Sequence, residues 1–140
     1  MSKKIKFIKT LFYIGAIVDV IAAIPLLFPV LAQSSFGLES YQVTDDYLYT
    51  SRMSAALMLG WAFLLFWGAS KPVERRGLLL ITLFPVVVGM IISSVLAVNS
   101  NFIEAKFMIV SWIYYLLIIP AYIYGYYIAS KNINKNHSLN

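Results

Sequence analysis

The chain has 140 residues, of which 61% are hydrophobic and 12% are charged, with a net charge of +5 and a mean hydropathy of +0.79. Soluble domains contain roughly 45–50% apolar and about 25% charged residues, so this composition excludes an ordinary water-soluble protein. The absence of cysteine excludes disulfides and cysteine-ligated metals, and the one histidine, His137, lies in a polar tail, so we expect neither a metal site nor a cofactor.

Four apolar segments follow one another along the chain, each close to the roughly 20 residues that a helix needs to cross the hydrocarbon core. They predict transmembrane helices at about residues 10–32, 52–70, 77–98 and 107–130. The segments are continuously apolar, whereas barrel strands alternate in polarity over about ten residues, so helices are favoured. Residues 33–51 form the predicted outer loop. The sequence therefore predicts an all-α, polytopic membrane protein, with residues 1–140 forming a single transmembrane domain built as a four-helix bundle.

Basic residues are distributed unequally between the two ends of these segments. Nine lysines and arginines lie before the first segment, between the second and third, or after the fourth, whereas only Arg52 and Lys106 lie at the other ends. Because lysine and arginine are enriched in short cytoplasmic loops, both termini are expected in the cytoplasm. The net positive charge then needs no nucleic-acid partner, since these residues do not form a patch with interleaved aromatic residues.

The first segment also has features of a cleavable signal peptide. It follows four lysines, and residues 30–32 resemble a processing site. However, its apolar run is longer than the roughly 7–15 residues of a signal core, and it contains an aspartate. We therefore expect it to be retained as the first helix.

Asp19 is the only formal charge in the interior of the four segments. At a rise of about 1.5 Å per residue it lies near the middle of the first helix, where an ionised carboxylate costs at least about 2.5 kcal/mol. We expect it to face the bundle interior, as a proton, cation or amine site or as a neutral acid that joins two helices. Candidate hydrogen-bonding partners are a carbonyl freed by a proline and the hydroxyls of Ser93, Ser94, Tyr115 and Tyr122.

Aromatic residues near the segment ends are typical of membrane-interface anchors, but Trp61, Tyr114 and Tyr115 lie deeper. These three are candidates for the wall of a pocket that holds a flat lipophilic ligand or, through cation–π contacts, an amine. The alternative is ordinary helix packing. No residue is assigned as catalytic, and the candidate ligand-binding residues are Asp19, Trp61, Ser93, Tyr115 and Tyr122.

A second candidate site is the outer rim formed by Asp45, Asp46 and Arg52. Adjacent aspartates are typical of turns and helix caps, which is the alternative to weak binding of a divalent cation. Arg52 is expected to pair with this loop or with a lipid phosphate. Membrane lipids are thus expected partners at this end, as are anionic headgroups beside the basic connection at the opposite end.

Small residues at four-residue spacing predict helix–helix contacts in lipid, because helices there associate through close packing. Prolines in the first, third and fourth segments also predict kinks that face the bundle. We expect three rows of small residues to face other helices of the bundle. They are Gly15 with Asp19 and Ala22 or Ala23, then Ala56 with Gly60, and then Pro85 with Gly89, Ser93 and Ala97.

Three stretches, GAIVDVIAAIPLLFP, SRMSAALMLGWAFLLFW and KPVERRGLLLITLFPVVVGM, resemble a group of small, uncharacterised bacterial four-helix integral membrane proteins. The resemblance covers the first three helices. It implies a multi-pass protein of the bacterial inner (cytoplasmic) membrane and adds no activity. In size and number of spans the chain is also similar to DoxX-like and sterol-isomerase-related membrane families, although it carries no diagnostic motif of either.

Three functions stay open on the sequence alone. The first is binding, or helping to transport, a lipophilic or cationic small molecule in the bundle near Asp19, with a homo-oligomer expected because the chain shows no repeated halves. The second is a structural or accessory subunit that binds another membrane protein. The third is an enzyme acting on a lipid or isoprenoid. It is disfavoured because one acid without a second titratable group or nucleophile at its depth is a poor catalytic set.

Overall fold

The computed structural model describes residues 3–38 and 41–137, with side chains described to residue 131. In this part of the chain all regular elements are helices, and four helical stretches are long and apolar enough to cross a membrane. The predicted all-α class with four membrane-length helices is therefore confirmed. The elements are α1 (Lys3–Leu27), α2 (Pro29–Phe36), α3 (Asp45–Ser70), α4 (Gly77–Ile81), the π-helix η1 (Thr82–Val87), α5 (Val88–Asn99) and α6 (Ala105–His137).

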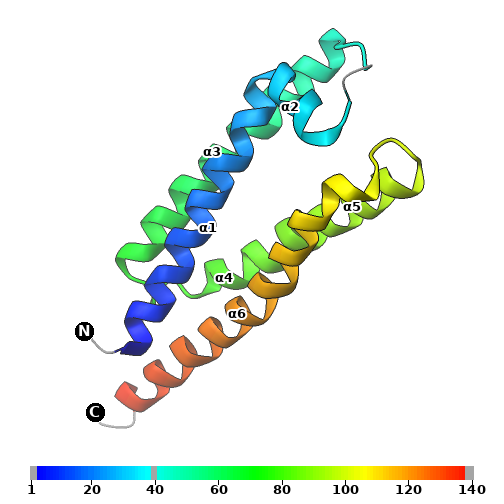
Figure 1. Ribbon diagram of the computed structural model, residues 1–140. Coiled ribbons are helices and arrows are strands. Elements are labelled where there is room, and N and C mark those ends of the chain that lie inside the picture. The colour runs from blue at the N-terminus through cyan, green and yellow to red at the C-terminus, as the bar shows by residue number, and fades with distance from the viewer. Residues whose placement is uncertain (1–2, 39–40, 138–140) are drawn as a thin grey trace.

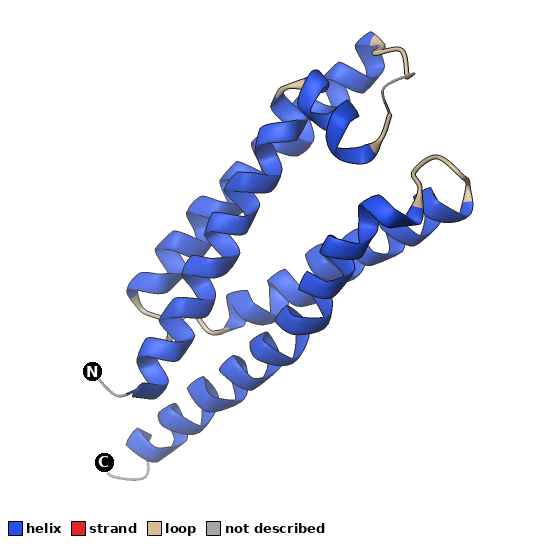
Figure 2. Cartoon of the chain, viewed as in Figure 1, coloured by secondary structure: helices blue, strands red, loops and turns tan. Residues whose placement is uncertain are grey.

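The long helices form two hairpins (Figure 1). One hairpin pairs α1 with α3, and the other pairs α6 with the continuous stretch of α4, η1 and α5. The two hairpins meet at the end that holds Lys3, the α3–α4 connection and the last turns of α6. From there they diverge toward the end that carries α2 and the α5–α6 connection (Figure 2).

The core lies where the hairpins converge. The largest fully buried side chains are Ile8 and Phe12 of α1, Leu65 of α3, Leu79 of α4 and Tyr122 of α6. These residues come from both hairpins and from the halves of the helices nearest the shared end. The two hairpins pack most closely at that end. Further along they enclose a space, and beyond it they meet again where Gly37 lies against Phe107 and the ring of Tyr41 lies 5.8 Å from that of Phe102.

The first predicted helix is divided in two at Phe28. Pro29 lacks a backbone N–H and occupies the first turn of α2, where that donor is not needed. Phe28, which precedes the proline, is extended with φ −121° and ψ 97°, as its steric contact with the proline ring favours. The predicted span of residues 10–32 therefore becomes α1, which begins earlier at Lys3, followed by the separate α2.

The predicted outer loop over residues 33–51 is also shorter than expected. Helix α2 continues to Phe36, and α3 begins at Asp45. The Thr44 hydroxyl caps α3 by accepting a hydrogen bond from the backbone N–H of Tyr47 at 3.3 Å. Asp45 and Asp46 lie in the first turn of α3, where acidic side chains interact favourably with the helix dipole.

The third membrane-length helix contains the π-helix η1 around Pro85. Its wider turn accommodates the missing proline N–H and inserts an extra residue into the helical repeat. As a result Val87 and Ser94 face inward, while Pro85 and Ser93 are exposed. The predicted packing of the row from Pro85 to Ala97 inside the bundle is therefore wrong at Pro85 and Ser93, whereas Gly89 and Ala97 are half-buried.

The row of Ala56 and Gly60 in α3 is a second incorrect packing prediction. Both residues are exposed, and a Cβ added at Gly60 would meet no heavy atom within 4 Å. Helix α3 instead turns Ala55, Ala62 and Leu65 toward the core. The spacing identified a helix face correctly, but spacing alone does not reveal which of two apolar faces meets the partner helix.

Gly37 should be the most sensitive position at the divergent end. It ends α2 with a left-handed φ of 67°, and a Cβ there would overlap the ring of Phe107 in α6. We expect Gly37→Ala to lower the free energy of unfolding by about 1–3 kcal/mol through backbone strain and overpacking. Denaturant unfolding in detergent micelles measures this loss. Gly77→Ala is the control, since a Cβ there meets no heavy atom within 4 Å. Equal losses in both variants would contradict the account.

Candidate functional site

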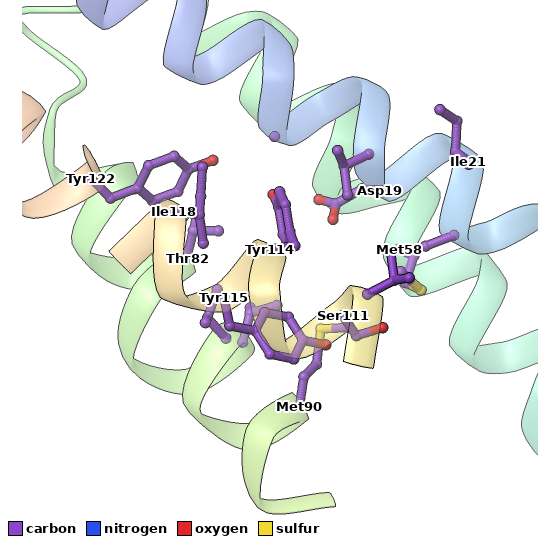
Figure 3. A pocket seen from close by; sticks show the side chains of 16 residues that line it. Asp19, Ile21, Met58, Thr82, Met90, Ser111, Tyr114, Tyr115, Ile118 and Tyr122 are labelled. Atoms are coloured by element: carbon purple, nitrogen blue, oxygen red, sulfur yellow. The ribbon is translucent and has the colours of Figure 1, made fainter. Parts of the chain in front are cut away.

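A cavity of about 380 Å³ lies between the two hairpins and has Asp19 in its wall (Figure 3). Residues of α1, α3, η1, α5 and α6 line it, so both hairpins contribute. Most of the wall is apolar, as expected for a small-molecule site in a membrane bundle. Its polar lining residues are Asp19, Thr82, Ser111, Tyr114, Tyr115 and Tyr122.

Asp19 projects from α1 toward the tyrosines of α6, as Figure 3 shows. Tyr114 and Tyr122 line the same cavity as Asp19. Its Oδ2 atom is buried and has no hydrogen-bond partner within the described residues. The salt bridges among those residues join Lys71 to Glu74 and Lys106 to Glu104, so no basic side chain of the described chain compensates this carboxyl group.

Tyr122 forms the end of the cavity nearest the core. Its side chain is 1% exposed, and its hydroxyl is a second buried polar atom without a hydrogen-bond partner in the described chain. The hydroxyl occupies the space where a Cβ of residue 15 would lie. Only glycine at position 15 lets α1 and α6 approach this closely, so the predicted close packing of this row is confirmed at Gly15, whereas Asp19 and Ala22 line the cavity.

Tyr114 and Tyr115 come from successive positions of α6, and their ring centroids lie 5.9 Å apart in an edge-to-face arrangement. Tyr114 points toward Asp19, whereas Tyr115 lies nearer η1 and α5 (Figure 3). Together with Ser111, Ile118 and Tyr122 they form one stripe with spacings of three or four residues. That stripe adds Ser111 to the lining, beside Tyr114, which the sequence already indicates as a pocket-wall candidate.

The five predicted ligand-binding residues are only partly brought together. Asp19, Tyr115 and Tyr122 line the main cavity. Trp61 instead borders a smaller cavity of about 210 Å³ that also reaches Asp19, and its indole N–H donates to the Thr82 hydroxyl at 3.1 Å. Ser93 is exposed and lines neither cavity.

Ser94, the other predicted serine partner of Asp19, has a different role. It is buried, and its hydroxyl accepts a hydrogen bond of 2.9 Å from the indole N–H of Trp112. This bond joins α5 to α6 within one hairpin. A polar residue at membrane depth thus serves helix packing here, as is common in membrane bundles.

The predicted outer rim lies at the start of α3, and none of its three residues lines the main cavity. Asp45 and Arg52 border the same surface hollow, which does not include Asp46. Arg52 forms no salt bridge with either aspartate in the described chain. Within the described residues there is no group of three or more histidine, cysteine, aspartate or glutamate side chains that could hold a metal ion.

The cavity combines one carboxyl group with three phenol groups in an otherwise apolar space. Comparisons with family models, curated proteins and solved structures found no match to this chain. A carboxyl oxygen without a partner favours a ligand that donates hydrogen bonds or carries positive charge, and the aromatic rings favour the same charge.

Proposed function

We propose that this protein binds, or helps to transport, a small lipophilic molecule with a cationic amine in the cavity beside Asp19. The observation that carries the proposal is the buried Oδ2 of Asp19, which has no partner within the described residues and faces an apolar space. The volume of about 380 Å³ lies within the range of small-molecule sites.

An isolated carboxylate inside a membrane is energetically costly. At membrane depth this cost is at least about 2.5 kcal/mol, and a buried charge is tolerated best when it is paired and hydrogen-bonded. An ammonium group brings both the opposite charge and hydrogen-bond donors. The rings of Tyr114 and Tyr122 add cation–π attraction of about 0.5–2 kcal/mol when they face the ammonium group. The site therefore favours an amine over an alcohol of the same length.

Octylamine and octanol provide a matched test, because they differ only in the polar group. Thermal unfolding of the protein in phosphatidylcholine nanodiscs is measured with increasing concentrations of each. Saturating octylamine should stabilise the fold by about 2.7 kcal/mol at a hundredfold excess over its Kd, whereas octanol should have a much smaller effect. Equal effects of the two compounds would indicate simple partition into the lipid and would contradict the proposal.

We further infer that the protein lies in a bacterial cytoplasmic membrane with both termini in the cytoplasm. The support is the clustering of basic residues at the end where the hairpins meet. There Arg75 lies over the ring of Trp67 at 3.4 Å from the centroid, and Arg76 donates to Ser130 at 3.0 Å. Guanidinium groups held beside aromatic rings at a helix end suit the level of lipid headgroups.

The orientation is tested by cysteine labelling, which has no background because the chain contains no cysteine. Glu74→Cys and Ser100→Cys introduce thiols in exposed connections at opposite ends. In intact cells, a membrane-impermeant maleimide should label Ser100→Cys and leave Glu74→Cys unlabelled until the cells are lysed. The reverse pattern would overturn the proposed orientation.

A second candidate function, that of a structural or accessory subunit, is supported by the exposed small-residue face of Ala56 and Gly60. Such faces favour helix association in lipid, and a second copy of this chain is the simplest partner. We expect Gly60→Leu to reduce self-association several-fold without lowering monomer stability, measured by native mass spectrometry from nanodiscs. Val20→Leu, an enlargement on the exposed part of α1, is the control. Unchanged self-association of Gly60→Leu would remove this candidate interface.

A further inference from the structure

Asp19 lies at the junction of two cavities. The main cavity of about 380 Å³ and the smaller one of about 210 Å³ share Asp19, Met58, Val86 and Met90 as lining residues. The remaining walls of the smaller cavity are Leu57 and Trp61 of α3. The space beside Asp19 therefore continues from the tyrosines of α6 to the gap between α3 and the η1–α5 stretch.

The two cavities differ in chemistry. The main cavity contains three tyrosine hydroxyls, a threonine and a serine in addition to Asp19. In the smaller cavity Asp19 is the only charged residue, and the one other polar group, the Trp61 indole N–H, already donates to Thr82. A ligand that spans the junction thus meets polar groups on one side of Asp19 and an apolar wall on the other.

The smaller cavity also reaches the outer surface of the bundle. Leu57 is 71% exposed, so this cavity opens beside a residue on the outer surface of α3, which faces the hydrocarbon when the chain spans a bilayer. Met58 and Met90, which both cavities share, have flexible unbranched side chains that adapt to a ligand chain. The gap between α3 and α5 is therefore suited to an alkyl chain that continues into the lipid.

We propose that the ligand is a single-chain amphiphile whose amine lies between Asp19 and the tyrosines, and whose alkyl chain passes between Met58 and Met90 toward Leu57 and the surrounding lipid. This inference rests on the proposed function, because the amine end occupies the same site. It adds the class of ligand, a long-chain amine, and the direction in which its chain leaves the bundle.

Photolabelling tests the direction of the chain. The probe is a dodecylamine with a diazirine near the middle of its alkyl chain, the part expected between Met58 and Leu57. It is added to the protein in phosphatidylcholine nanodiscs and irradiated, and the adducts are mapped by peptide mass spectrometry. Saturable adducts are expected on Leu57, Met58 or Trp61, and excess octylamine should displace them. In Asp19→Asn the labelling should fall about tenfold or more, because the hydrogen bond to a charged group is lost. Glu74→Gln, the same exchange at an exposed site, should label as the wild type does.

The outcomes separate this inference from the proposed function. Adducts that octylamine displaces but that lie on the α6 side, at Val110 or Ser111, would overturn the direction of the chain and leave the amine site intact. The absence of any displaceable adduct in the wild type would overturn both. Because displacement by octylamine is measured on the wild-type protein, the test does not depend on the folding of a variant.

Discussion

Asp19→Asn should abolish the stabilisation that octylamine gives to the wild-type protein. Asparagine keeps the shape of the side chain and removes the negative charge, so the ammonium group loses its counter-charge inside the membrane. Hydrogen bonds to charged groups contribute about 1.5–3 kcal/mol, so the Kd for octylamine should rise by about tenfold or more. Thermal unfolding at a series of octylamine concentrations measures the change.

Two comparisons make this result specific. Glu74→Gln changes an exposed carboxylate at the surface and should leave the response to octylamine unchanged. Without octylamine, Asp19→Asn should unfold at the same temperature as the wild type or higher, because no partner of the described chain is lost with its buried Oδ2. Equal octylamine stabilisation of the wild type and Asp19→Asn would contradict an amine site at this residue.

Gly15→Ala should produce a large loss of stability through overpacking between α1 and α6. The added Cβ would overlap the Tyr122 hydroxyl and come within 3.1 Å of Leu65 Cδ1. Both neighbours are fully buried, so neither moves without disturbing the core. Overpacking of this kind costs about 1–3 kcal/mol, and denaturant unfolding in micelles measures it.

Tyr122→Phe should restore most of this loss when combined with Gly15→Ala. The phenylalanine lacks the overlapping hydroxyl, and the nearest remaining ring atom, Cζ, lies at an ordinary contact distance of 3.5 Å from the added Cβ. Tyr122→Phe alone should be neutral or stabilising, since it removes a buried hydroxyl that has no partner in the described chain. If the double variant were as unstable as Gly15→Ala alone, the described contact between α1 and α6 would be contradicted.

The periodicity of the sequence was sufficient to predict the main architecture and part of the site. Continuous apolar runs of about membrane length identified the four long helices, because each must satisfy its own backbone in lipid. A lone carboxylate at membrane depth had to face the interior, and Asp19 does. Tyr115 and Tyr122 follow from the same helical stripe, which also contains Tyr114.

The remaining site residues depended on features that spacing does not encode. The π-helix around Pro85 shifts the repeat of the third long helix, so Ser94 and not Ser93 is buried. Trp61 lies near the middle of its helix, as predicted. Its indole N–H donates a hydrogen bond to the Thr82 hydroxyl of the other hairpin, which the spacing of residues does not reveal. The cavity likewise depends on how the two hairpins pack against each other, because residues of both line it.

The most direct test of an amine site at Asp19 is nuclear magnetic resonance of the protein in deuterated detergent with octylamine. An amine bound at Asp19 should give intermolecular nuclear Overhauser effects between the methylene next to the amine and the ring protons of Tyr114 and Tyr122, and these should be lost in Asp19→Asn. Contacts of that methylene confined to outward-facing side chains such as Leu116 and Ile123, unchanged in the variant, would contradict an amine site at this residue.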